Sequence, residues 1–247
     1  KRTSIHPLLN DLKEEKESRI QEFVSSIFVN KWNAEKSCLI VCNTVKRSIE
    51  VFDTIRSYLE ENNLENPLYY LSTNIIPAQR LERIKNIKED IQDHKAPILI
   101  ATQVVEAGVD LDFDMGFRDI GPIDSIIQVA GRINRNNTIE KTHSPLYIID
   151  FDVKATMMVY GRLTYIQAKK SLEQKKCFYE KEYLELITTY FDGISDKSSF
   201  GDARNFFKSM KTLKYDSDEK SELPVSAFRI IEESDRYAAV FIETDED

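Results

Sequence analysis

The sequence predicts an α/β fold in which helices flank a parallel sheet. Short apolar runs bounded by polar residues alternate with segments in which apolar residues recur at helical spacing. The candidate buried strands are Ser37–Asn43, Leu68–Leu71 and Pro97–Ala101. Three strand–helix alternations in succession favour parallel pairing through right-handed crossovers.

The composition is that of an ordinary globular protein. The 247 residues suffice for one large domain, or for a domain of about 150 residues with an appendage. Hydrophobic residues make up 41% and charged residues 31%, and no run of 18 apolar residues occurs. We therefore expect a soluble, cytoplasmic protein. The absence of an initial methionine is expected for a piece of a longer protein.

Net charge and the positions of the cysteines and histidines exclude several classes of protein and site. The net charge of −8 argues against a protein that coats nucleic acid non-specifically, although a local basic track remains compatible with it. Cys38 and Cys42 lie on one candidate strand, roughly 13 Å apart, which is too far for a disulfide. Core packing is the expected role of both. The scattered histidines predict neither a metal site nor catalysis; they are His6, His94 and His143.

The elements before the first strand and after it follow from apolar spacing. Residues 1–10 are expected to be an irregular entry, and about Leu9–Val29 an amphipathic helix. Its apolar face comprises Leu12, Ile20, Phe23, Val24 and Ile27. Thr44 is placed to cap a helix that ends near Asn62. A further helix is expected at Gln79–Ile91, and further strands at Met115–Ile120 and Leu146–Ile149.

The last third of the chain predicts a mainly helical appendage. Helical patterns fill residues 153–190, Gly193–Gly201 is turn-like, and Phe200–Met210 is a short helix. Phe228–Ile231 and Ala238–Ile242 alternate as a β-hairpin. The predicted domains are an N-terminal helix at 1–33, the sheet domain at 34–152 and a helical extension at 153–247.

Polar stretches follow the predicted strands. Ligands of open parallel sheets gather at the carboxyl ends of the strands, so these stretches are expected to line one edge. They are Asn43-Thr44, Ser72-Thr73-Asn74, Thr102-Gln103 and the loop around Gly121.

The octamer QVAGRINR carries two arginines. If it is helical, Gln128, Gly131, Arg132 and Arg135 share one face. Two guanidiniums on one face suit phosphate oxygens and predict an anion clamp, for example for a nucleotide γ-phosphate. The alternative is a solvated basic helix end.

Two other patterns favour structural roles. A calcium loop starting at Asp110 and continuing through Asp112 and Asp114 would need glycine at Met115 and glutamate at Gly121, so that interpretation fails twice. The aromatics Tyr179, Tyr183 and Tyr190 are spaced for a helix core, with base stacking as the alternative.

Three segments in this order resemble a known family. VCNTVKR (residues 41–47), ATQVVEAGVDLDFD (101–114) and RDIGPIDSIIQVAGRINRN (118–136) are similar to the second RecA-like lobe of a superfamily-two helicase. Within that superfamily, the TQVVE, DLDFD and PIDSIIQ motifs are most similar to those of the CRISPR-associated helicase-nuclease of type I interference systems. The resemblance covers about residues 37–150 and implies a RecA-like fold with a helical C-terminal extension.

The resemblance implies a role for each matched position. Arg132 and Arg135 would reach the ATP γ-phosphate held by the first lobe, and the ATP-binding residues would be Gln128, Gly108 and Asp110. Single-stranded DNA would contact the strand ends through its backbone. Those positions are Asn43, Thr44, Ser72, Thr73 and Thr102. Val129 departs from the family, which often has arginine there.

The implied partners lie outside this chain. The sequence has no GxxxxGK[ST] loop, no DExH magnesium motif and no histidine–aspartate nuclease cluster, so we expect no activity from it alone. The Mg²⁺ of ATP would be held by the first lobe. An HD nuclease domain of the same protein, single-stranded DNA and a CRISPR effector complex are the other implied partners. Two alternatives stay open: a non-motor nucleic-acid-binding or regulatory module, and a lobe of an RNA helicase.

Overall fold

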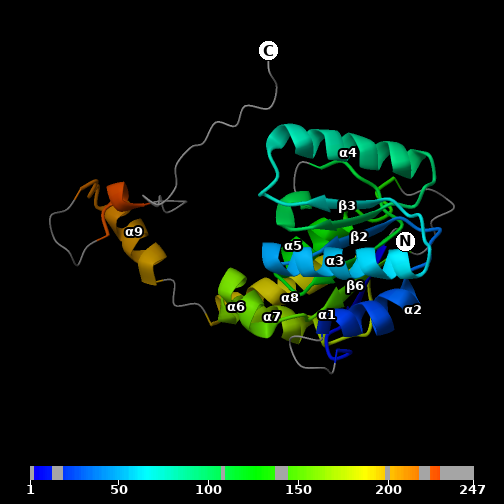
Figure 1. Cartoon of the computed structure of the whole chain (residues 1–247). Helices are drawn as coiled ribbons and strands as arrows, with labels where there is room; N and C mark the ends of the chain where they lie inside the picture. The colour runs from blue at the N-terminus through cyan, green and yellow to red at the C-terminus, as the bar shows by residue number, and fades with distance from the viewer. Residues whose placement is uncertain are drawn as a thin grey trace, which may run out of the picture. The chain divides into compact units, whose positions relative to one another are not determined.

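The computed structural model of the chain describes residues 3–12, 19–106, 109–136, 144–197, 201–216 and 223–228. The chain divides into two compact units, Lys1–Lys197 and Ser198–Asp247 (Figure 1). The first contains the sheet. The second contains α9 (Gly201–Lys211) and the 3₁₀ turn η4 (Val225–Ala227). The three-domain division at residues 33 and 152 stays a prediction.

The described part of the first unit contains a seven-stranded sheet in the order β3-β4-β2-β5-β6-β1-β7. Six strands pair in parallel, and β7 pairs antiparallel with β1. The predicted α/β fold with a parallel sheet is therefore confirmed. The strands are β1 (Thr3–Leu8), β2 (Cys38–Val41), β3 (Leu68–Leu71), β4 (Ile98–Ala101), β5 (Met115–Asp119), β6 (Ser144–Ile149) and β7 (Phe178–Tyr179).

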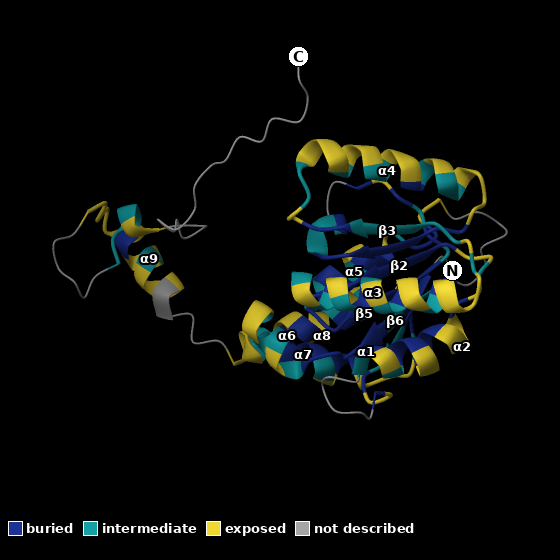
Figure 2. Ribbon diagram, viewed as in Figure 1, coloured by how far each residue is buried: buried dark blue, intermediate teal, exposed yellow. Residues whose placement is uncertain are grey.

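Helices cover both faces of the sheet, because the central strands are apolar on both sides. In β2, Leu39 and Val41 pack into one hydrophobic cluster, whereas Cys38 and Ile40 pack into the other. Figure 2 shows these strands buried between helices whose outer faces are exposed. The first cluster includes residues of α4 (Pro77–Gln92), α5 (Ile123–Ala130), α7 (Arg162–Leu172) and α8 (Tyr183–Ser195). The second includes residues of α1 (Arg19–Glu22), the π-helical turn η1 (Phe23–Phe28) and α3 (Val45–Glu61).

The N-terminal prediction was wrong for the first residues and for the start of the helix. The residues expected to form an irregular entry include strand β1, which pairs in parallel with β6, Ile5 lying opposite Leu146. The described helical residues begin at Arg19 rather than near Leu9 and continue through η1 into α2 (Val29–Lys31). The residues of the predicted apolar face are all buried, although Leu12 is not helical: Leu12, Ile20, Phe23, Val24 and Ile27.

The C-terminal elements agree with the sequence in part. Helices fill most of 153–190, starting with α6 (Val153–Tyr160), and α9 confirms the short helix predicted at Phe200–Met210. The turn predicted from Gly193 was wrong at its start, since α8 continues to Ser195. Gly193 lets α8 pack closely against Gln167, since a Cβ at this position would lie 2.6 Å from Gln167 Oε1. The predicted hairpin, apart from Phe228, lies outside the described residues.

The core role of the two strand cysteines is confirmed. Cys38 and Cys42 are fully buried and unbridged. Burial raises the pKa of both thiols well above the usual value, so neither is a reactive thiolate. Among the described helices, none has the length and apolar character to cross a membrane.

Candidate functional site

The predicted polar edge forms where β2, β3, β4 and β5 end. Parallel pairing sets Val41 beside Ala101 and Arg118, and Leu71 beside Ala101. The residues that follow these strands therefore emerge at one edge of the sheet. This places Asn43, Thr44, Ser72, Thr73 and Thr102 along the same edge, as the sequence predicted.

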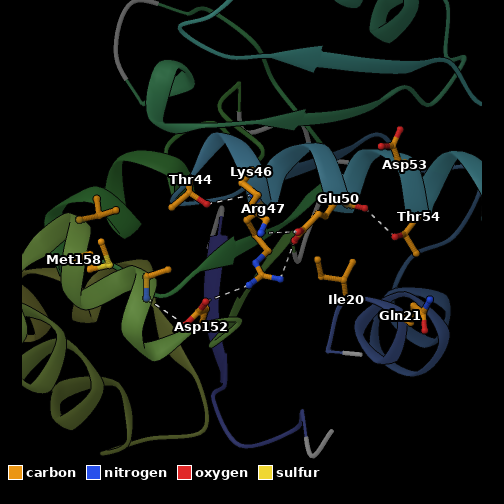
Figure 3. A pocket seen from close by; sticks show the side chains of 12 residues that line it. Ile20, Gln21, Thr44, Lys46, Arg47, Glu50, Asp53, Thr54, Asp152 and Met158 are labelled. Carbon is orange, nitrogen blue, oxygen red and sulfur yellow. Dashed lines mark hydrogen bonds and ion pairs between the residues drawn. The ribbon is translucent and has the colours of Figure 1, made fainter. Parts of the chain in front are cut away.

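Thr44 opens α3 at this edge. Its backbone is extended, and its Oγ1 accepts a hydrogen bond from Arg47 N at 3.2 Å, which confirms the predicted helix cap. Arg47 pairs with Glu50 at 3.1 Å and with Asp152 at 3.4 Å (Figure 3). These side chains line a hollow of about 980 Å³ between α1, α3 and α6. Within this hollow, Glu50 and Asp152 therefore compensate the charge of Arg47.

The other predicted DNA-binding side chains differ in accessibility. Thr73 is exposed and Thr44 is half-buried, whereas Asn43, Ser72 and Thr102 are buried. The Asn43 amide donates to Ile120 O at 2.7 Å and to Thr156 Oγ1 at 3.1 Å. In this conformation the Asn43 side chain stabilises the interior of the edge.

A buried arginine lies behind the edge. Arg118, on β5, is fully buried. Its Nη1 donates to Asn43 Oδ1 at 2.5 Å and to Asp119 O at 2.7 Å. Its Nη2 lies 2.9 Å from Glu106 Oε1, which forms the ion pair that its charge requires. Arg118 therefore joins the ends of β2 and β5 to the segment that follows β4.

Asp119 lies within the same buried region. Its carboxylate accepts from Asn43 N and Phe151 N, each at 3.4 Å. Burial raises the pKa of Asp119 to about 7, although Arg118 and the two amide donors act in the opposite direction. Asp119 is thus a buried carboxyl group that titrates near neutral pH.

The arginine motif is not one helix face, and that prediction was wrong. Helix α5 ends at Ala130, so Gln128 is helical whereas Arg132 and Arg135 lie beyond the helix. The chain leaves the helix because Ile133 forms a parallel bridge with Phe113. Phe113 N donates to Arg132 O at 3.0 Å, and Asn134 N donates to Phe113 O at 2.8 Å.

The two arginines nevertheless lie close together. Arg132 donates from Nε to Val105 O at 3.2 Å and from Nη2 to Glu106 O at 2.9 Å. Burial, together with the neighbouring charge of Arg135, lowers the pKa of Arg132. The two backbone carbonyls fix the direction of the Arg132 guanidinium.

Arg135 is the more exposed of the pair. Its Nη1 lies 3.0 Å from Asp110 Oδ1, and its side chain is 41% exposed. Asp110 is 70% exposed and also lies 3.5 Å from Lys88 Nζ. The structure thus brings Arg132, Arg135 and Asp110 together. Gln128 is exposed on the last turn of α5, and Gly108 lies outside the described residues.

The neighbouring aspartates have structural partners. Asp112 accepts from Arg135 N at 2.8 Å and from Asn136 N at 3.2 Å, which holds the arginine segment. Asp114 accepts from Ser37 N at 2.9 Å and from Ser37 Oγ at 2.7 Å. No group of His, Cys, Asp and Glu side chains in the described ranges could hold a metal ion.

Sequence reasoning missed Glu106, Arg118 and Tyr160, which form the interior of the site. Tyr160 OH lies 3.0 Å from Arg118 Nη2 and 3.0 Å from Gln103 Nε2. One signal was available: Arg118 and Asp119 are adjacent charges in the otherwise apolar run MGFRDI. A charge in a buried strand requires partners and indicates a buried ionic network.

Residues 34–138 match the family model described as CRISPR-associated nuclease/helicase Cas3, C-terminal. Over 144 residues the chain is 33% identical to the CRISPR-associated nuclease/helicase Cas3 of Methanothermobacter thermautotrophicus, covering 58% of this chain and 16% of that protein. The chain resembles the C-terminal helicase lobe of Cas3. The family resemblance inferred from its motifs is confirmed.

Solved Cas3 structures share the fold. The T. fusca Cas3-AMPPNP structure has a TM-score of 0.62 at 20% identity, covering 86% of this chain and 26% of that chain. A chain of the CRISPR RNA-guided surveillance complex in the pre-nicking state has a TM-score of 0.59 at 20% identity, covering 86% and 27%. This chain therefore has the RecA-like α/β fold of a Cas3 helicase lobe. It spans about a sixth of the length of the curated Cas3 relative that it matches.

Proposed function

We propose that this chain is the second motor lobe of an ATP-dependent helicase that translocates on single-stranded DNA during CRISPR interference. The observation that carries the proposal is the grouping of Arg132, Arg135 and Asp110 beside a Cas3-like sheet edge. Two adjacent guanidiniums suit the charge that develops on a transferring phosphoryl group.

Arg132 and Arg135 would serve ATP hydrolysis in different ways. Arg132 is already oriented by the carbonyls of Val105 and Glu106. Arg135 is held by an exposed carboxylate, so it can exchange Asp110 for a γ-phosphate at small cost. Asp110, Gly108 and Gln128 would complete the ATP contacts from this lobe. The first lobe would hold the rest of the nucleotide with its Mg²⁺.

Single-stranded DNA would lie along the edge formed by the strand ends. Thr44 and Thr73 have the accessible hydroxyls, and the backbone beside Asn43, Ser72 and Thr102 would complete the contacts. Hydroxyls and backbone amides contact phosphates without recognising bases, so no sequence preference is expected. Opening and closing of the cleft between the lobes would alternately release and grip the strand.

The proposed partners follow from the same assignment. They are a first RecA-like lobe and an HD nuclease domain of the same protein, single-stranded DNA, and a CRISPR effector complex. The similarity to a chain of a CRISPR surveillance complex supports the last of these.

A reconstitution experiment tests the proposal. The chain is mixed with the first lobe of its own protein, and ATP hydrolysis is measured with and without single-stranded DNA. We expect little hydrolysis from either part alone and DNA-stimulated hydrolysis from the mixture. Stimulation by single-stranded RNA in preference to DNA would instead support an RNA helicase. Nucleic-acid binding with no nucleotide effect in the mixture would contradict the motor role.

A further inference from the structure

The buried Arg118 is the centre of a polar network that the proposed function does not use. Its two terminal nitrogens lie within hydrogen-bond distance of acceptors from five residues. These residues are Asn43, Asp119, Glu106, Ser125 and Tyr160, and they come from five different elements or connections of the chain. A guanidinium this deeply buried is stable only if its surroundings satisfy its charge, so the network holds those parts in one arrangement.

Glu106 connects this network to Arg132. Its carboxylate accepts from Arg118 Nη2 at 2.9 Å and from Ser125 Oγ at 2.7 Å. Its backbone carbonyl accepts from Arg132 Nη2 at 2.9 Å. Glu106 therefore contacts Arg118 through its side chain and Arg132 through its backbone.

Tyr160 brings α6 of the C-terminal extension into the network. Its hydroxyl accepts from Arg118 Nη2 and from Gln103 Nε2, both at 3.0 Å. Gln103 Nε2 also donates to Asn43 O at 2.9 Å. The Tyr160 hydroxyl thus contacts Gln103, three residues before Glu106. Through Gln103 it is linked to Asn43, the residue before Thr44.

Gly121 shows how closely this region is packed. A Cβ at Gly121 would lie 3.1 Å from Arg118 Nη2 and 3.4 Å from a ring carbon of Tyr160. The absence of a side chain at position 121 therefore lets the guanidinium and the tyrosine ring approach each other. The contact between β5 and α6 therefore depends on Arg118, on Tyr160 and on the lack of a side chain at Gly121.

We propose that Tyr160, Arg118 and Glu106 are positioning residues that set the direction of the Arg132 guanidinium and link it to the strand end at Asn43. The proposal rests on the proposed function of Arg132 in ATP hydrolysis. It gives the extension beyond residue 152 a part in the motor: α6 holds the arginine segment through Tyr160. None of the three residues is expected to touch ATP or DNA.

Tyr160→Phe is the sharpest test, because it removes a hydroxyl that accepts two hydrogen bonds and leaves the ring in place. In the reconstituted two-lobe protein we expect kcat for DNA-stimulated ATP hydrolysis to fall about tenfold, with KM for ATP within about twofold. Glu106→Gln, which keeps the shape and loses the charge, is expected to act in the same direction. Unchanged kcat in both variants, together with an Arg132 guanidinium that has not moved, would overturn the proposal.

Tyr165→Phe is the matched control. Tyr165 is a buried tyrosine of α7 whose hydroxyl donates to Asp150 Oδ2 at 2.6 Å. Within the described residues its hydroxyl contacts Asp150 and Lys169 rather than Glu106 or Arg132. We expect Tyr165→Phe to leave kcat within about twofold of the parent. An equal loss of kcat in Tyr160→Phe and Tyr165→Phe would show a general packing effect and would overturn the positioning role.

A second readout separates this proposal from the proposed function. The Arg132 Nε–H group, which donates to Val105 O, can be followed by NMR in the chain alone. We expect Tyr160→Phe and Glu106→Gln to shift this signal and to speed its exchange with water, whereas Tyr165→Phe leaves it unchanged. A shifted signal with unaltered hydrolysis would contradict the function of Arg132, whereas an unshifted signal would contradict its positioning by Tyr160.

Discussion

The guanidiniums of Arg118 and Arg135 lie in opposite environments. Arg118 is fully buried and contacts acceptors from several strands and helices. Arg135 is 41% exposed and lies 3.0 Å from Asp110, which is itself 70% exposed. A buried charge cannot change partners without a large cost, whereas an exposed pair exchanges partners readily. The contrast assigns Arg118 to the structure of the lobe and supports the proposed role of Arg135 as the arginine that changes partner.

Arg118→Met tests the buried arginine and should have the largest effect on the free energy of unfolding. It removes the charge that compensates Glu106, so the free energy of unfolding should fall by about 3–5 kcal/mol. Denaturant unfolding of the chain measures this change. Arg135→Ala, the exposed counterpart, should cost no more than about 1 kcal/mol. Equal losses of unfolding free energy in the two variants would contradict the contrast between a buried Arg118 and an exposed Arg135.

Asp119, next to Arg118 in the buried network, makes the stability of the fold depend on pH. Burial raises its pKa from 3.8 to about 7, so the folded state holds the proton more tightly than the unfolded state. Its contribution to stability is therefore complete below pH 3.8 and is lost as the pH rises through about 7. We expect the urea midpoint of the parent to fall across this window more steeply than that of Asp119→Asn.

The control for this prediction is Asp53→Asn, at a side chain that is 53% exposed. This variant should keep the pH dependence of the parent. If Asp119→Asn also kept it, the buried carboxyl would not be the titrating group.

Asp110→Ala tests the exposed ion pair with Arg135 and should have the smallest effect on the free energy of unfolding. The carboxylate lies 3.0 Å from Arg135 and 3.5 Å from Lys88, and both pairs are solvated. The free energy of unfolding should change by about 0–1 kcal/mol, and added salt should reduce the difference further. A loss of several kcal/mol in thermal or urea unfolding would mean that Arg135 is fixed by this pair.

The sequence predicted those parts of the fold that local patterns determine. The apolar runs located β2, β3, β4, β5 and β6, and Thr44 located the start of α3. Strand β1 was missed because its partner β6 is about 140 residues away, and no local pattern encodes that pairing. Parallel pairing across such a separation becomes visible only in three dimensions.

The candidate site was predicted by residue type better than by geometry. Arg132, Arg135 and Asp110 do lie together, but not on a helix face, because the bridge between Ile133 and Phe113 ends the helical course. The interior partners of the site were not predicted, since Glu106 and Tyr160 acquire their roles through Arg118. Hydrophobic periodicity contains no information about which polar groups a buried charge will contact.

The central claim is that Arg135 acts on ATP across a cleft between two lobes. Its most direct test is the DNA-stimulated ATPase rate of the reconstituted two-lobe protein carrying Arg135→Ala. Arg56→Ala, at an arginine that is 55% exposed on α3, is the matched control. An arginine that stabilises a phosphoryl-transfer transition state contributes about 10³-fold or more to kcat, so Arg135→Ala should lose on the order of 10³-fold while Arg56→Ala stays near the parent. An Arg135→Ala protein as active as the parent would contradict the account.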